Sequence, residues 1–187
     1  MTLSAWPFPQ GTCRRYRAEV NLTVTAVDRL EPHALGLVRL RGEELQAHYG
    51  DHGPTPPPDR YPDGAAQALA GEVPHLDGDL ADVATPGVVL LGRDRRAGTA
   101  VAFANLRHVT GGVAEVRCLY VAPPFRGIGI SRTLLTEVER EAAALGWPLV
   151  RVRVSPRQPH ATAFYRESGY RPTPPSPLLL EKHVRHP

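Results

Sequence analysis

Residues 114–146 constrain the fold more than any other stretch, because their hydrophobic period changes from two residues to about 3.6 within a few positions. Over 114–121 the even-numbered residues are apolar and the odd-numbered ones include two charges, which predicts a strand with one buried face. A pair of prolines then ends the strand. Apolar residues recur at helical spacing from Ile130 to Leu145, and a glycine follows, so an amphipathic helix with a defined end is predicted.

The turn between this strand and this helix is a candidate phosphate site. Its residues are Arg126, Gly127, Ile128, Gly129, Ile130 and Ser131. Glycines let the backbone approach a ligand closely, and the first N–H groups of a helix, with the positive end of its dipole, suit a phosphate or pyrophosphate. The alternative is that the two glycines only form a tight turn, and a lone G-x-G leaves that open. A dinucleotide fingerprint would need a small residue where Arg132 stands.

Hydrophobic periodicity predicts strands and helices on both sides of this unit. The predicted strands span 18–26, 87–91, 99–106, 114–121, 149–155 and 170–184, and the predicted helices span 31–49, 65–73, 130–145 and 159–168. Residues 51–86 are rich in Pro, Gly and Asp and are predicted to be mostly loop.

The composition is that of a single globular domain. The chain has 187 residues, 42% of them hydrophobic, and no apolar run near the ~20 residues of a membrane span. Residues 1–15 show no period and no signal-peptide core, so we expect a tail that is flexible or ordered by a partner in a homodimer, ahead of a domain at 16–187. Cys13 and Cys118 suggest no disulfide framework, which favours the cytoplasm.

Charge is distributed unevenly along the chain. The net charge is +3, yet residues 51–86 hold seven acidic residues against Arg60, a net of −6. This segment favours a cationic amine as ligand, such as a polyamine, an aminoglycoside or a basic peptide end. Arg117, Arg151 and Arg153 on the predicted central strands favour a ligand with a carboxylate instead, and the sequence leaves both open. Because the arginines are interleaved with acidic residues and no reading motif is present, nucleic acid is not an expected partner.

Two motifs, in the right order, resemble those of the GNAT superfamily of N-acetyltransferases. The first is [QR]-x-x-G-x-[GA] after a strand ending in hydrophobic-Val-x-Pro; Arg126 and Gly129 match it, while Ser131 departs from Gly or Ala. The second is N-x-x-A-x-x-x-Y-x-x-x-G-[FY]; it matches at Ala161, Tyr165, Gly169 and Tyr170, while Gln158 replaces Asn. The resemblance is to small bacterial members and covers about 20–177.

The resemblance implies a fold and a co-substrate. The fold would be α/β (α+β), with a mixed, mostly antiparallel sheet of six or seven strands that splays between strands 4 and 5, flanked by about four helices. The co-substrate would be acetyl-CoA, with its pyrophosphate on the turn from Arg126 to Ser131. The pantetheine and thioester carbonyl would meet backbone N–H groups near Leu119, Tyr120 and Val121, and the side chain of Gln158.

The resemblance also implies catalytic residues. Tyr165 takes the place of the tyrosine that donates a proton to the departing CoA thiolate; simple packing beside Phe164 is the alternative. Glu115 takes a position where some members keep a general base. Arg117, two residues further on, would instead form an ion pair that lowers the pKa of this carboxyl and makes it a poor base, and both readings stay open.

We therefore expect an acetyl-CoA-dependent N-acetyltransferase that moves an acetyl group to a primary amine of a small molecule or peptide by direct attack in a ternary complex. The competing expectation is a GNAT-shaped module that binds CoA or a small ligand without turnover. The histidines have no metal-ligand spacing, so no metal is expected, and His108 and His160 are the two to test for proximity to the cleft. In such a fold, residues 51–86 would border the acceptor site, or be a solvated surface loop.

Overall fold

The computed structural model describes residues 21–28, 31–49, 87–156 and 158–185. The strands are β1 (Leu22–Val27), β2 (Val88–Asp94), β3 (Ala100–Thr110), β4 (Val113–Val121), β5 (Leu149–Arg153), β6 (Arg171–Thr173) and β7 (Ser176–His183). The α-helices of this part of the chain are α1 (Pro32–Tyr49), α4 (Ile130–Ala144) and α5 (Pro159–Glu167), with a 3-10 turn η2 (Pro123–Phe125). The tail predicted at 1–15 and the helix predicted at 65–73 lie outside the described residues.

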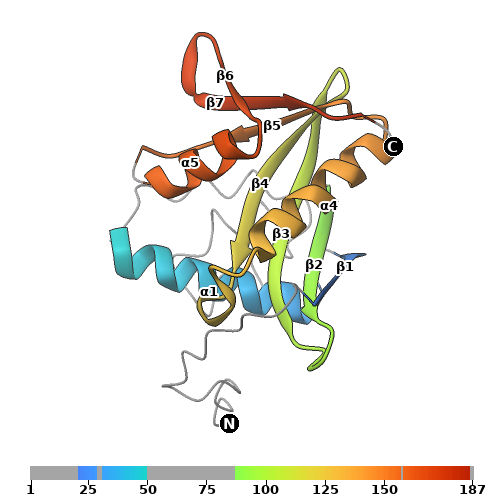
Figure 1. Cartoon of the computed structure of the whole chain (residues 1–187), viewed down its shortest axis with the longest axis vertical. Coiled ribbons are helices and arrows are strands. Elements are labelled where there is room, and N and C mark those ends of the chain that lie inside the picture. The colour runs from blue at the N-terminus through green and yellow to red at the C-terminus, as the bar shows by residue number, and fades with distance from the viewer. Residues whose placement is uncertain (1–20, 29–30, 50–86, 157, 186–187) are drawn as a thin grey trace, which may run out of the picture.

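The described strands form one sheet in the order β1-β2-β3-β4-β5-β7-β6 (Figure 1). Neighbouring strands pair antiparallel, except β4 and β5, which run parallel. A parallel pair needs a long crossover, and α4 provides it. The mixed, mostly antiparallel sheet expected from the sequence is therefore confirmed.

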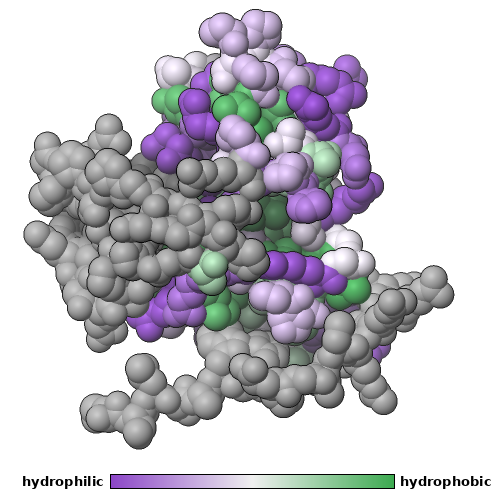
Figure 2. All heavy atoms as spheres, turned by 90° about the vertical axis from the view of Figure 1, so that its left-hand side faces the viewer, coloured by the Kyte–Doolittle hydropathy of each residue, from purple (hydrophilic) through white to green (hydrophobic). Residues whose placement is uncertain are grey.

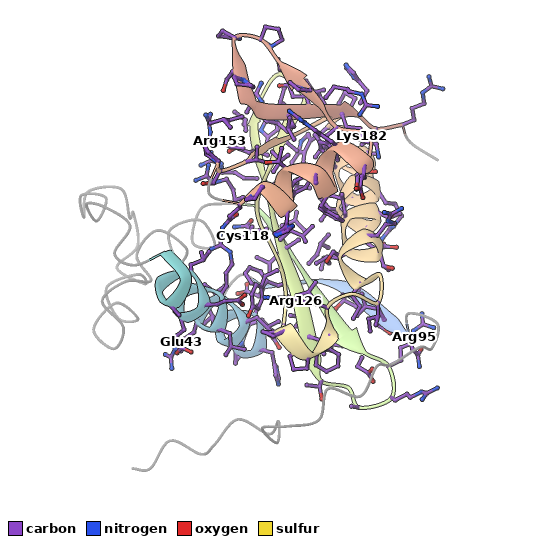
Figure 3. All side chains as sticks on the ribbon, turned by 60° about the vertical axis from the view of Figure 1, so that its left-hand side comes forward. Glu43, Arg95, Cys118, Arg126, Arg153 and Lys182 are labelled. Carbon is purple, nitrogen blue, oxygen red and sulfur yellow. The ribbon has the colours of Figure 1, made fainter. Side chains whose placement is uncertain are left out.

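Helices cover the two faces of the sheet. Figure 3 shows α1 on one side of the sheet and α4 with α5 on the other. The first core contains Leu37 and Val38 of α1; the second contains the apolar stripe predicted for α4, with Leu134 and Val138 fully buried. Leu145, assigned to the same stripe, is 43% exposed instead, because α4 ends at Ala144 and the chain turns there.

A β-bulge in β4 changes which of its side chains share a face. The register with β3 skips Arg117, which is thus an extra residue on β4. Val116 consequently packs in the core under α4, whereas Cys118 packs in the core under α1. The expectation that the even-numbered residues of 114–121 all share one face is wrong, because strict alternation assumes a strand without a bulge.

The last predicted strand is a hairpin. Instead of one strand over 170–184, β6 and β7 pair antiparallel around a turn at Pro174 and Pro175. Proline has no N–H to give to a ladder, so two in succession break the strand and leave room for a turn. The pair forms the edge of the sheet beyond β5.

The two parallel strands separate after four residue pairs. Val113–Val116 pair with Leu149–Val152, and β4 then continues to Val121 beside β3 alone. On the other side, Val154 leaves toward β7 and donates its N–H to the carbonyl of Leu178 at 2.8 Å. This opening between the fourth and fifth strands is the expected splay, which is therefore confirmed.

Candidate active site

A cavity of about 860 Å³ lies where β4 and β5 separate. The described residues that line it are Arg41, Glu44 and Leu45 of α1, residues 116–121 of β4, Arg126 and Ser131, residues 152–154 at the end of β5, and Gln158, Pro159, His160, Ala161, Phe164 and Tyr165. Figure 2 shows hydrophobic residues recessed at the middle of one face, with hydrophilic side chains around them. The cavity thus joins residues from three regions that are far apart in the sequence, 41–45, 116–131 and 152–165.

Leu119, Tyr120 and Val121, whose backbone groups the resemblance assigned to the pantetheine and thioester, line this cavity. They pair with β3 along one edge of β4. The opposite edge has lost β5 as a ladder partner, so backbone groups there are available to a bound amide or carbonyl. The splay therefore leaves this edge of β4 without β5 as a ladder partner beyond Val116.

The glycine turn leads into α4 with left-handed backbone at two positions. Gly127 has φ +75° and Gly129, the N-cap of α4, has φ +93°. The carbonyl of Gly129 accepts from the N–H groups of Arg132 and Thr133, which starts the helix. Among the described residues, no carbonyl accepts from the N–H groups of 127–131, which suits an anionic ligand. Of this turn, Arg126 and Ser131 reach the cavity.

Arg126 is held by protein groups. Its Nη1 and Nη2 each lie 2.6 Å from the carboxylate of Glu44, and its Nε donates to the carbonyl of Val121 at 2.8 Å. The guanidinium also lies 5.4 Å from the ring centroid of Tyr120. The Tyr120 hydroxyl donates to Glu44 at 3.1 Å, and burial with this carboxylate nearby raises the pKa of Tyr120 to about 12. The motif arginine thus links the glycine turn to β4 and α1.

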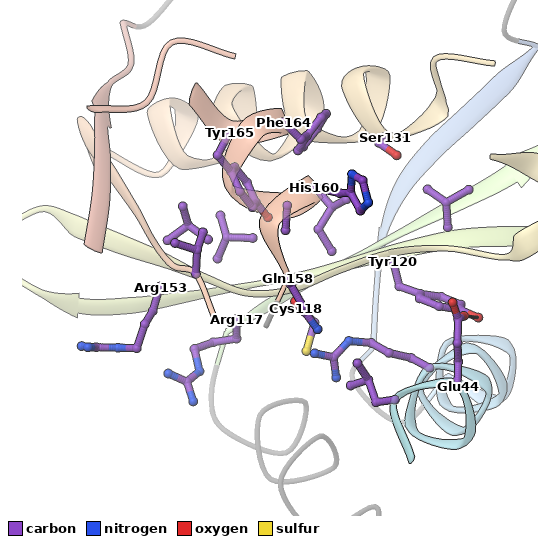
Figure 4. Close-up of a pocket in the computed structure, with 18 of the residues that line it drawn as sticks. Glu44, Arg117, Cys118, Tyr120, Ser131, Arg153, Gln158, His160, Phe164 and Tyr165 are labelled. Carbon is purple, nitrogen blue, oxygen red and sulfur yellow. Dashed lines mark hydrogen bonds between the residues drawn. The ribbon is translucent and has the colours of Figure 1, made fainter. Parts of the chain in front are cut away.

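Tyr165 lies at the inner wall of the cavity. It is 6% exposed, and its ring contacts those of Phe164 and Tyr170 edge-on, with centroids 5.2 and 5.4 Å away. Its hydroxyl makes no hydrogen bond within the described part of the chain, and in Figure 4 it points toward the cavity. Burial, followed by the neighbouring Cys118 thiol, raises the pKa of this phenol above its ordinary value. The phenol is therefore protonated near neutral pH and available as a donor.

Gln158 and His160 also reach the cavity, and His108 does not. Gln158 is the N-cap of α5, and His160 is an exposed residue in the first turn of that helix. His108 stacks on Trp147 instead, with centroids 5.1 Å apart, and is absent from the described lining. Of the two histidines singled out in the sequence, His160 alone has a place in the site.

Glu115 lies beside the cavity and is held by two arginines. The residue is 6% exposed and is not among the described lining residues. Arg117 Nη1 donates to its Oε1 at 2.8 Å, and Arg107 Nη2 lies 3.5 Å from its Oε2. Both carboxylate oxygens thus face guanidinium groups, the arrangement of the ion-pair alternative.

Several lining residues had no signal in the sequence. Arg41 and Glu44 reach the cavity from α1. The periodicity of the sequence predicts this helix but does not show where on the sheet it packs. Cys118 is buried at the cavity wall because of the bulge at Arg117, which no periodicity reveals. Neither a metal-binding group of His, Cys, Asp and Glu side chains nor a helix able to cross a membrane occurs among the described residues.

Comparison with known proteins agrees with this geometry. The model of the acetyltransferase (GNAT) family matches residues 51–170. The chain belongs to the GNAT family. It is 31% identical over 167 residues to IAA acetyltransferase of Azospirillum brasilense, a match that covers 86% of this chain and 95% of the relative. The resemblance drawn from the two motifs is thereby confirmed, and this GNAT protein is an acyltransferase.

Solved GNAT structures have the same fold. PaiA N-acetyltransferase of Thermoplasma acidophilum, solved in complex with coenzyme A, superposes with a TM-score of 0.58 at 18% identity, covering 87% of this chain and 99% of that one. IAA acetyltransferase of Bacillus cereus gives a TM-score of 0.54 at 16% identity, covering 81% and 78%. At such identities the likeness extends to the fold. Membership of the GNAT family adds the general reaction, which is transfer of an acetyl group from an acyl-CoA donor.

Proposed function

We propose that this GNAT protein transfers the acetyl group of acetyl-CoA to a primary amine of a small molecule or peptide, by direct attack within a ternary complex. The observation that carries the proposal is a cavity at the splay that is lined both by the glycine-turn residues Arg126 and Ser131 and by Tyr165. A donor bound along it would have its phosphates at the start of α4 and its thioester between β4 and β5.

The first part of the proposal concerns binding of the donor. The unpaired N–H groups of 127–131 would hold the pyrophosphate, with the dipole of the 15-residue helix α4 adding to the attraction. The exposed edge of β4 at Leu119–Val121 would hold the pantetheine amides and the thioester carbonyl, and Gln158 would add an amide contact from the facing side. Arg126 would act by fixing this turn against Glu44, since that carboxylate already compensates its charge.

The second part concerns the chemistry. The amine nitrogen forms a bond to the thioester carbonyl carbon, the carbon–sulfur bond breaks, and CoA leaves as a thiol after gaining a proton. Backbone donors on β4 would stabilise the oxyanion, and the protonated Tyr165 would give its proton to the leaving sulfur. The proton that the attacking nitrogen loses would then restore the phenol, so that no net proton is gained or lost. Glu115, enclosed by Arg107 and Arg117, would serve as an ion-pair partner, and the amine would enter already deprotonated.

Acetyl-CoA binding and thiol release test this proposal in sequence. At 100 times its dissociation constant, acetyl-CoA should stabilise the protein by about 2.7 kcal/mol, a rise in Tm on the order of 5 to 10 °C. Free thiol should then appear at a rate that depends on the added amine. Absence of any thermal shift at millimolar acetyl-CoA would contradict the proposed binding site. A clear shift with no thiol release from a broad amine panel would instead indicate a binding module without turnover.

A further inference from the structure

We propose that the acceptor amine carries a carboxylate, which binds to arginines at the end of the cavity away from the glycine turn, with Arg153 of β5 as the principal contact. The inference rests on the proposed function, and it names the chemical class of the acceptor. It begins from the charge of the cavity wall. Of its described residues, four are arginines and one is a glutamate, a formal charge of +3.

The arginines of the wall are not equivalent. Arg126 is neutralised by Glu44, with both guanidinium nitrogens at 2.6 Å. Arg117 shares Glu115 with a second arginine, so that one carboxylate faces two cations. Arg153 is exposed and makes no hydrogen bond or ion pair with any described residue. The fourth arginine, Arg41, is a partly buried residue of α1. Arg153 is therefore the exposed arginine of the wall for which no partner is described, and it places positive charge at the β5 end of the cavity.

Arg151, the neighbouring arginine on β5, forms an ion pair within the sheet and can be compared with Arg153. Arg151 and Arg153 lie on the same face of β5, because the alternating Val150, Val152 and Val154 pack in the core under α4. Arg151 meets Glu181 of β7 at 2.7 Å, and Glu181 also accepts from Thr173. Arg153 has no such partner among the described residues, and it is the one of the two that lines the cavity.

The position of this charge separates it from the proposed phosphate site. Figure 4 shows Arg117 and Arg153 at the opposite end of the close-up from Ser131. The glycine turn is where the phosphates of the donor would bind, so these two arginines face the side from which the acceptor would enter. A guanidinium binds a carboxylate through two parallel N–H donors, which fixes orientation as well as affinity.

A cationic wall also suits an amine that must react in its neutral form. Positive charge nearby disfavours an ammonium, so an amine bound next to Arg153 loses its proton more easily. This agrees with the environment of Glu115, the buried carboxylate that the described residues place beside the cavity, because two arginines hold it in ion pairs. The contrary expectation, a cationic acceptor, came from residues 51–86, which lie outside the described residues.

Matched pairs of acids and amides test the inference. Glycine, β-alanine and 4-aminobutanoate would each be compared with its carboxamide, by thiol release from acetyl-CoA. Because a carboxylate raises the pKa of a nearby amine, kcat/KM is compared per concentration of neutral amine. In at least one pair, kcat/KM for the acid should exceed kcat/KM for its amide by about tenfold. The number of carbons between amine and carboxylate in that pair then indicates the distance from the anion site to the thioester.

The variant Arg153→Gln tests whether Arg153 causes the preference for the acid over its amide. It should lower kcat/KM for the preferred acid about tenfold, leave kcat/KM for the amide and KM for acetyl-CoA unchanged, and so remove the preference. Arg96→Gln is the matched control, since Arg96 lies in the β2–β3 turn, is exposed and is outside the cavity lining. Amides that react as well as acids, or an equal loss for both in Arg153→Gln, would overturn the inference.

Binding of products separates this inference from the proposed function. N-acetylglycine, N-acetyl-β-alanine and 4-acetamidobutanoate would be titrated into the CoA-bound protein by calorimetry, beside their carboxamides. In one outcome, an acid binds, Arg153→Gln weakens that binding about tenfold, and no amine releases thiol. This outcome would contradict acetyl transfer but support the anion site. Thiol release from uncharged amines, with no acid bound in preference to its amide, would retain the transfer and overturn the anion site.

Discussion

At the scale of single residues, Tyr165 combines structural and chemical properties. Its ring packs edge-on against Phe164 and Tyr170, which fixes its direction. Its hydroxyl is directed to a cavity where no described group accepts from it. Burial raises the pKa of this phenol, so the proton is kept throughout the working range of pH. A rigid, protonated donor is what a departing thiolate needs.

Tyr165→Phe should lower kcat for thiol release about a hundredfold and leave KM for acetyl-CoA within about twofold, because the donor acts on the leaving group. Initial rates at varied acetyl-CoA, measured with a chromogenic thiol reagent, give both constants. Tyr120→Phe is the control, since Tyr120 lines the same cavity but its hydroxyl is hydrogen-bonded to Glu44. An equal loss of kcat in the two variants would contradict a specific role for Tyr165.

At the scale of elements, the site depends on two departures from regular structure. The bulge at Arg117 turns Cys118 toward α1, and the splay frees one edge of β4 beyond Val116. The start of α4 requires left-handed backbone at Gly127 and Gly129, a conformation in which a Cβ is strained. These irregularities lie where the sheet meets the cavity, in agreement with strain being concentrated at functional sites.

Gly129→Ala should destabilise the protein by about 1 kcal/mol and lower Tm by roughly 2 to 4 °C, because φ at this residue is +93°. It should also weaken acetyl-CoA binding, since relief of the strain would move the N–H groups of the turn. Thermal unfolding with and without acetyl-CoA measures both effects. Gly98→Ala is matched: its φ is +67°, nothing lies within 4 Å of the added Cβ, and it is in the β2–β3 turn. Loss of acetyl-CoA affinity in both variants would refute the turn as the binding element.

At the scale of the whole molecule, buried phenols couple stability to alkaline pH. Burial is the main cause of the raised pKa of Tyr120, Tyr165 and Tyr170. A phenol whose pKa is higher in the folded than in the unfolded state binds more protons when folded. Its contribution to stability is therefore fully present below about pH 10, the unfolded value, and is lost as pH rises above it.

The free energy of unfolding should thus fall above pH 10, and Tyr165→Phe should reduce the fall between pH 10 and 11 by about 1 kcal/mol. Urea denaturation at pH 8, 10 and 11 measures the difference between wild type and variant. Between pH 7 and 9 the two curves should run parallel, since the phenol is protonated in both states. An unchanged slope above pH 10 would contradict a raised pKa at Tyr165.

The sequence by itself determined the elements and the family. Local periods, glycines and prolines place the helices α1, α4 and α5 and most strands within a few residues, because these signals act over neighbouring positions. Two motifs indicated the GNAT family, and the family implied the sheet and its splay. Two features were missed. The strand predicted over 170–184 is the hairpin β6–β7, because a turn divides it. Leu145 is exposed, because α4 ends one residue before it.

Only the tertiary structure decided how the charges of the site are distributed. Arg126 and Arg153 are alike in sequence, yet one is bound by Glu44 from a helix 82 residues away and the other faces the cavity without a described partner. The bulge at Arg117 likewise decides which side chains of β4 face α1. Ion pairs between distant elements and the register between strands are set by packing of the whole sheet, which leaves no period or motif in the chain.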